Sequence, residues 1–447
     1  MTAIISEQKY MDNRELTLRG IILGALITVV FTAANVYLGL KIGLTFGSSI
    51  PATIISMAVL RLMGGGTMLE NNMVQTQASA AGTLSCVFAA LPALIMVGYW
   101  HEFPYVITLL LTMAGGMTGV VFTIPLRRAL VSNSDLPYPE GTACAEILRA
   151  SSPEGDARSL KSLTLGTLVS GAVAFATSGL RLLSDGFSAA TVVGSSAFRL
   201  NGSFSLALLG TGYLVGIGGG IAMLLGVFLA WGVMVPVLGH LAPSATPLAE
   251  ASGLWLHKVR FIGAGTIAVA AVWTLLALAR PVAQGLKEAL SVTHLATGDD
   301  SDRDLSPRTL IGLCAGLAIL LAALFGYFLW PVMPHGGALG TLVVLGLIAC
   351  FGLGFLVASA CGYMAGIIGS SSSPISGVGI IAIIVISVAL WGLESGGILT
   401  VDQRPIAIAF GLFVLSAITA SAAVSNDNLQ DLKTGQLVGA APWRQEV

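Results

Sequence analysis

The sequence predicts an all-α polytopic membrane protein with about eleven or twelve transmembrane helices, some of them broken or re-entrant, and with internal repeats. Hydrophobic residues make up 55% of the 447 positions, charged residues make up 10%, and the mean hydropathy is +0.88. A soluble domain carries about 25% charged residues. In addition, apolar runs close to the roughly 20 residues that cross a bilayer follow one another along the chain.

The apolar runs define the expected elements in chain order. They cover residues 18–40, 46–63, 73–97, 106–124, 163–183, 206–238, 259–278, 310–330, 338–360, 375–391 and 406–424. The glycine-rich stretch from Gly216 to Gly220 predicts a break in the long run 206–238, because glycine weakens a helix and permits a tight turn. With that break, the basic loops fall on the cytoplasmic side, where short loops collect Lys and Arg.

Only short polar segments lie outside these apolar runs. We expect residues 1–17 to form a cytoplasmic N-terminus, and 18–447 to form a single transmembrane domain with polar loops at 125–162 and 280–308. The net charge of −1 gives no basic footprint for nucleic acid. The five cysteines stand singly, without a CxxC pair or a histidine at ligand spacing, so we expect no metal site.

A polar segment between two apolar runs is the first candidate site. Asn71, Asn72 and Gln75 fall at or near membrane depth, where amides are expensive to bury, and this favours a substrate path. In a helix, Asn71, Gln75 and Ser79 share one face and offer donors and acceptors to a peptide-like solute. The alternative is that these amides hold neighbouring helices together.

The second candidate follows the run 106–124. Two prolines flank Tyr138, which we assign to substrate binding, and Pro139 suits the first position of a short helix that carries Glu140 and Glu146. A partly buried carboxylate here would accept a proton or an ammonium group. The alternative is that Glu140 only complements the helix dipole and that Glu146 faces water.

The third candidate is the serine-rich segment that ends at Pro374. Ser372 and Ser373 precede a proline and predict a helix start, whose free N–H groups and partial positive charge favour an anionic group such as a peptide carboxylate. An ordinary capped helix start at the membrane surface is the alternative. The segment also echoes Ser48-Ser49-Ile50-Pro51, and residues 71–76 loosely match 426–431, which suggests an internal repeat.

The order of these motifs is similar to that of the oligopeptide transporter (OPT) family, which includes the plant yellow stripe-like carriers. The resemblance rests on Glu70–Thr76, Ala78–Gly82, Leu136–Glu146, the serine segment and Asp431–Gly435. It implies proton-coupled import of small peptides or peptide-like metal chelates by a multi-pass protein of the plasma membrane, the inner membrane in a bacterium. It further implies no cofactor beyond the proton gradient.

The residues agree with an ATP-independent, non-enzymatic protein. The chain contains no GxxxxGK[ST] loop and no GxSxG or HExxH motif. We expect alternating access, in which Glu146 as first choice and Glu140 as second take the coupling proton. Family members usually continue through further spans, so we expect a missing C-terminal half. An inactive fragment, a partner subunit of a transport complex and a homo-oligomer stay open, as does the choice between peptide and chelate.

Overall fold

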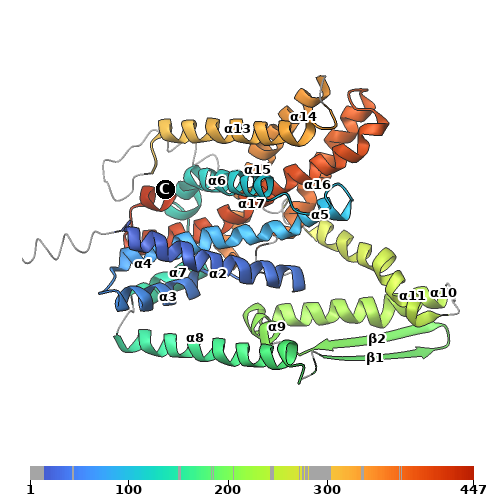
Figure 1. The fold of residues 1–447 in the computed structure, drawn as a ribbon, viewed down its shortest axis with the longest axis horizontal. Helices are drawn as coiled ribbons and strands as arrows, with labels where there is room; N and C mark the ends of the chain where they lie inside the picture. Colours follow the sequence, from blue (N-terminus) through green and yellow to red (C-terminus); the bar gives the residue numbers. More distant parts are fainter. Residues whose placement is uncertain are drawn as a thin grey trace, which may run out of the picture. The chain divides into compact units, whose positions relative to one another are not determined.

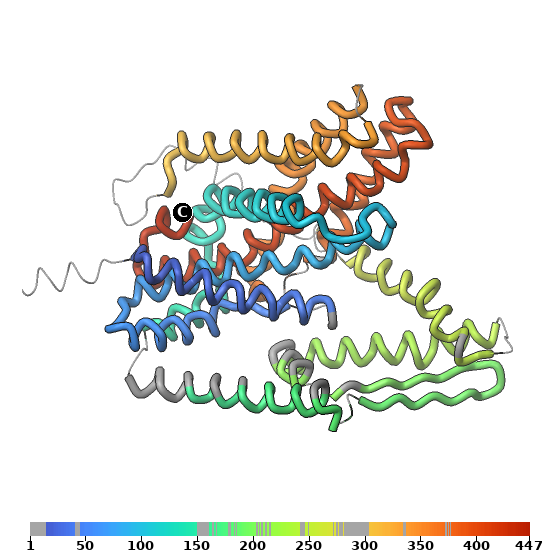
Figure 2. Tube along the Cα trace, in the orientation of Figure 1, coloured from blue at the N-terminus to red at the C-terminus, as the bar shows by residue number. Residues whose placement is uncertain are grey.

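The computed structural model describes residues 15–42, 45–149, 153–182, 184, 186–204, 206–241, 246–270, 272–273, 276, 280, 304–333, 337–371, 373 and 375–447. These residues are almost entirely helical, with one two-stranded sheet (Figures 1 and 2). The all-α prediction is therefore confirmed. The chain divides into two compact units, one formed by Met1–Ala157 with Ala271–Val447 and the other by Arg158–Ala270.

The first unit contains most of the membrane-length helices. Its described helices are α2 Leu18–Ile42, α3 Ser49–Leu62, α4 Met68–Gly82, η1 Thr83–Ala89, α5 Pro92–Met96, α6 Tyr105–Arg127, η2 Arg128–Ser132, α7 Pro139–Arg149, α13 Pro307–Leu329, α14 Gly337–Ile348, η7 Ala349–Leu353, α15 Gly354–Ile368, α16 Ile375–Ser395, η8 Val401–Gln403, α17 Arg404–Val438 and α18 Pro442–Glu446. The expected short helix at Pro139 is α7, so much of the expected loop 125–162 is helical.

Eight helices within the described residues are long and apolar enough to cross a membrane, fewer than the eleven or twelve expected. Two of the expected runs contain shorter apolar helices within the described residues, Ser49–Leu62 and Leu168–Thr177. The run 259–278 and the loop 280–308 lie partly outside the described residues. The count of eight therefore applies to the described residues alone.

Helix α17 is the central element of the first unit. It is 35 residues long, 89% of its most apolar window is buried, and it contacts α4, α6, α7, α15 and α16 (Figure 1). Its N-terminal half packs in an aromatic core, in which the rings of Phe328 and Phe413 stack with centroids 4.3 Å apart. Burial of aromatic rings fixes this half of the helix in place.

Small residues allow α6 to approach α17 closely. A Cβ atom added at Gly115 would lie 2.7 Å from the main-chain oxygen of Ala417, and one added at Gly119 would collide with the main chain of Ser421. Backbones that pack this closely need glycine at the contact, as is usual between membrane helices. The glycines of α6 therefore set the distance between these two helices.

The second unit begins at Arg158 and contains most of α8 Pro153–Ala174. It also contains a β-hairpin that the sequence did not predict. Its other elements are η3 Phe175–Gly179, β1 Gly186–Val193, β2 Ser196–Ser203, α9 Leu206–Val227, η4 Phe228–Met234, α10 Val235–Leu241, α11 Pro247–Leu254 and η5 Trp255–Val259. The antiparallel strands pair Val193 with Ser196, and Gly194 takes φ 66° in the turn, a value that glycine tolerates. Helix α9 breaks at Gly216, as the glycine pattern predicts.

Candidate functional site

The C-terminal half of α17 carries a cluster of buried polar side chains within the candidate span Val401–Val438. Each of these side chains is at most 3% exposed. They are Ser425, Asn426, Asp427, Asn428, Gln430, Asp431 and Thr434. Polar groups in a membrane interior are costly unless they are hydrogen-bonded or serve a function, so this half of α17 is the natural centre of a site.

Helix α4 brings the first predicted segment against α17. Thr67 caps the helix, and Asn71, Asn72 and Gln75 are all buried. The Gln75 amide donates to the Asp431 carboxylate, whereas Ser56 donates to Asn71 Oδ1 at 2.8 Å. Both side-chain atoms of Asn72 lack a partner within the described part of the chain. Asn71 thus joins α3 to α4. Gln75 and Asn72 have buried polar atoms without a hydrogen-bond partner in the described chain.

Glu70 of the same segment has a structural role. Its carboxylate binds Arg19 of α2 at 2.7 Å, and Thr17 donates to it as well. Arg19 also donates to the main-chain oxygen of Gly65 at 2.7 Å. These contacts fix the Gly64–Gly66 turn and the start of α4 against α2.

The turn before α7 delivers the second predicted segment. Tyr138 is fully buried with φ 43°, a strained value for a residue with a side chain, and its main-chain N–H donates to Gly366 O at 2.9 Å. Its hydroxyl has no partner among the described residues, and burial raises the pKa of this phenol. Burial also raises the pKa of the Cys144 thiol to about 12, so this cysteine is an inert packing residue.

The first turn of α7 is joined directly to α17. The main-chain N–H of Gly141 donates to Gln430 Oε1 at 2.8 Å, and the Thr434 hydroxyl donates to Gly141 O at 2.9 Å. A Cβ atom at Gly141 would collide with the main-chain oxygen of Gln430. The glycine after Glu140 therefore permits the close approach that places Glu140 beside α17.

The serine segment after α15 meets Glu140. Gly369 takes φ 93° and turns the chain so that Ser371 N–H donates to Glu140 Oε1 at 3.1 Å, while the Ser370 hydroxyl donates to Glu140 Oε2. Asn426 of α17 donates to Ser370 O at 3.0 Å. The anionic group at this turn is thus a carboxylate of the protein itself.

Two segments that resemble each other in the sequence are also neighbours in the structure. The main-chain N–H of Gly47, just before Ser48, donates to the Ser371 hydroxyl at 3.0 Å. Likewise, Gln75 of residues 71–76 contacts Asp431 of residues 426–431. The two halves of each echo therefore meet at the same polar centre.

The predicted residues separate into three groups in the structure. Asn72, Gln75, Tyr138 and Glu140 meet around α17, and the Ser373 hydroxyl is buried without a partner in the described chain. Glu146 is exposed on α7. Ser372 lies outside the described residues.

Sequence reasoning missed three residues at the centre, Asn426, Asp427 and Asp431. Of these, Asp427 and Asp431 lie close enough to Glu140 for the three carboxylates to interact electrostatically. The signal was available, because two Asp and two Asn within residues 426–431 follow an apolar run without a break. No cluster of three or more His, Cys, Asp or Glu that could hold a metal ion occurs in the described chain.

A cavity of about 480 Å³ lies along the same pair of helices. Met73, Thr76 and Gln77 of α4 and Asn428 of α17 line it, together with α2, α6 and α18. Gln445 of α18 also lines it and donates to Thr76 Oγ1 at 2.9 Å and to Asp431 O at 3.1 Å. The cavity therefore reaches the seam between α4 and α17.

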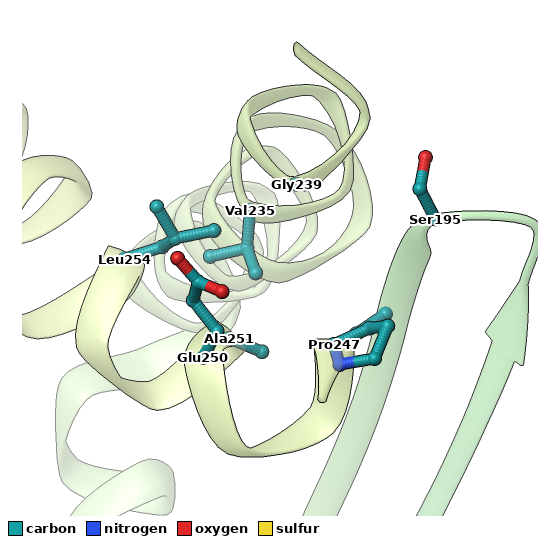
Figure 3. A pocket seen from close by; sticks show the side chains of 8 residues that line it. Ser195, Val235, Gly239, Pro247, Glu250, Ala251 and Leu254 are labelled. Carbon is teal, nitrogen blue, oxygen red and sulfur yellow. The ribbon is translucent and has the colours of Figure 1, made fainter. Parts of the chain in front are cut away.

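The second unit contains a different cavity, between β2, α10 and α11. Figure 3 shows the carboxylate of Glu250 beside Leu254 and Val235, with Pro247 below them. Its volume is about 10 Å³, which is no more than one water molecule occupies. This cavity is too small for a solute.

Membrane-length helices around a buried polar centre define a polytopic membrane protein of the kind that passes solutes through a bilayer. The family model of the OPT oligopeptide transporter protein matches residues 15–447. The chain therefore belongs to the OPT family, as its motifs indicated.

Two relatives illustrate the kinship. The chain is 51% identical over 423 residues to a Haemophilus influenzae protein named for oligopeptide transport, an alignment covering 92% of this chain and 66% of the relative. It is 25% identical over 483 residues to the iron-phytosiderophore transporter YSL15 of Oryza sativa subsp. japonica, covering 96% and 68%. The chain thus spans about two thirds of the length of these relatives. Both are named as transporters, and no solved structure gives a significant match.

Proposed function

We propose that this chain acts as a secondary active transporter that imports small peptides or peptide-like metal chelates across the plasma membrane by alternating access. The observation that carries the proposal is the meeting of three polar segments, from α4, α7 and the turn after α15, on the buried half of α17. Since burying these groups costs free energy, a solute that satisfies them offers a reason for their presence.

The chemistry of the centre suits an amide-containing solute. Amide and hydroxyl groups offer both donors and acceptors, which a peptide backbone can match. The relatives are named for oligopeptides and for an iron phytosiderophore, and this supports a cargo within the same range. The cavity of about 480 Å³ falls within the usual size of small-molecule sites.

We propose a proton gradient as the energy source, without ATP and without a bound cofactor. Glu140 is the first candidate for the coupling carboxylate, because it joins α7 to the Ser370–Ser371 turn and thereby to α17. Protonation would weaken its hold on Ser371 N–H, since a neutral carboxyl accepts more weakly than a carboxylate. That difference in contacts between two states is what a coupling ion requires. The exposed Glu146 becomes the second candidate.

Uptake into proteoliposomes under an imposed pH gradient tests this proposal. The wild-type chain should accumulate a labelled tripeptide or an iron chelate only with an inward proton gradient. Glu140→Gln should reduce uptake to the level seen without a gradient, whereas Glu146→Gln should retain most of it. The reverse pattern would restore Glu146 as the coupling residue, and gradient-independent uptake by the wild type would contradict proton coupling.

A second candidate function is a partner subunit of a membrane transport complex. The observation that favours it is that the chain spans 66% of the length of the Haemophilus relative. If the purified chain binds peptide but transports none in proteoliposomes, while membranes of the source cell do transport it, the subunit function is the better description.

A further inference from the structure

Several buried polar atoms at the polar centre between α4 and α17 have no hydrogen-bond partner in the described chain. Five buried side-chain oxygens there have no partner in the described chain. They belong to Asn72, Gln75, Asn426, Asp427 and Asp431, and each of these side chains is at most 3% exposed. Unpaired buried acceptors are costly, so an added group that donates hydrogen bonds would stabilise the centre.

Three neighbouring amide donors already have acceptors, whereas the Asn72 amide nitrogen is itself without a partner in the described chain. The Gln75 amide donates to Asp431, the Asn426 amide donates to Ser370 O, and the Gln430 amide donates to Ala365 O at 2.6 Å. A carboxylate oxygen can only accept. Reorienting the amide of Gln75 would turn its oxygen toward the Asp431 carboxylate and would place two acceptors against each other.

Within the part of the chain that the structure describes, no ion pair compensates the charge of the centre. The described ion pairs involve Glu15, Glu70, Asp304 and Glu394, and none of them involves Glu140, Asp427 or Asp431. Lys433, on the same helix, turns away and donates to Gln436 Oε1 at 3.0 Å. Buried carboxylates without a counter-charge favour a cation.

Resting on the proposed function, we propose that Asp427 and Asp431 bind the primary ammonium group of the transported solute, with the side-chain oxygens of Asn72 and Asn426 as further acceptors. The two aspartates lie one turn apart on α17, so their side chains share a face. An ammonium group supplies three donors and one positive charge. A divalent metal is disfavoured because the described chain has no cluster suited to hold one.

The large cavity lies beside this position, along the α4–α17 seam. Thr76 lines the large cavity and follows Gln75 on α4, and Gln445 connects Thr76 with the main chain of Asp431. A peptide that enters the cavity with its amino end first would reach the aspartates once Gln445 gives way. Of the two solute types, this inference selects those with a free primary amine.

Equilibrium binding to the purified full-length chain tests the ammonium site separately from transport. We would compete a labelled trialanine with unlabelled trialanine and with N-acetyl-trialanine, which lacks the charged amine. The wild type should bind the acetylated form about 10- to 100-fold more weakly. Asp427→Asn and Asp431→Asn should abolish this preference, whereas the exposed Asp402→Asn should preserve it.

The outcomes are distinct. Equal competition by the acetylated form, or no binding of either form, would overturn the ammonium site. Binding of ²²Na⁺ that both aspartate variants abolish, without any preference for the free amine, would also overturn it by assigning the position to a metal cation. A clear amine preference together with failed uptake in proteoliposomes would support the site and reject the proposed transport by this chain alone.

Discussion

At the scale of single residues, the ring and the hydroxyl of Tyr138 can be assigned different roles. Its ring fills a buried position, yet its hydroxyl has no partner in the described chain. Tyr138→Phe should therefore leave the thermal unfolding midpoint unchanged or raise it, because an unpaired buried hydroxyl costs about 1 kcal/mol or more. If the hydroxyl serves the solute, as the sequence predicts, uptake should fall about 2- to 10-fold.

Tyr99 provides the matched control. Its hydroxyl donates to Phe328 O at 3.3 Å, so Tyr99→Phe removes a hydrogen bond that exists in the protein. This variant should lower the midpoint while leaving solute affinity unchanged. A Tyr138→Phe variant that destabilises as much as Tyr99→Phe would mean that the Tyr138 hydroxyl has a structural partner.

At the scale of elements, the contact between α6 and α17 depends on glycine. Gly119→Ala places a methyl group against the main chain of Ser421, which cannot move without shifting α17. We expect a loss of roughly 1–3 kcal/mol in stability, measured as a lower thermal midpoint in detergent. Uptake should fall as well, because the polar residues of α17 follow Ser421 in the same helix and would shift with it.

Gly326→Ala on α13 is the control for that substitution. No atom lies within 4 Å of the added Cβ, so the methyl group has room. Alanine is the better helix former by about 1 kcal/mol, and the midpoint should stay level or rise. Equal destabilisation by both variants would show that helix flexibility, and not the close contact, explains the need for glycine.

At the scale of the whole molecule, Glu446 should make the stability depend on pH. Burial raises the pKa of Glu446 to about 7, with Asp304 adding to this effect, and with Leu305 N–H and Arg127 opposing it. Between about pH 4.5 and 7 the folded chain then binds more protons than the unfolded chain, so stability falls as the pH rises and levels off above 7.

The thermal midpoint should thus be higher at pH 5 than at pH 8, by an amount equivalent to about 1–3 kcal/mol. Glu446→Gln should flatten this dependence and raise the midpoint at pH 8. The exposed Glu102→Gln should keep the wild-type profile. An unchanged slope in Glu446→Gln would assign the pH dependence to other groups.

Hydropathy predicted the membrane class because the apolar runs differ strongly in composition from the sequences of soluble proteins. Pro139 predicted the start of α7 because its φ and its missing N–H suit a first helical turn. Asn426 and Asp431 were not assigned to a site because their partners, the Ser370 turn and Gln75, are distant in sequence. Only the fold shows that these segments share one centre.

The buried polar half of α17 also bears on how the protein is made. Transfer of a helix with two aspartates and several amides from the insertion machinery into lipid is unfavourable, because lipid offers these groups no hydrogen-bond partners. However, α4, α6, α7 and α15 precede α17 in the chain, so a ribosome has completed them before α17 emerges. Insertion of α17 and its docking onto these earlier helices are therefore expected to occur as one step.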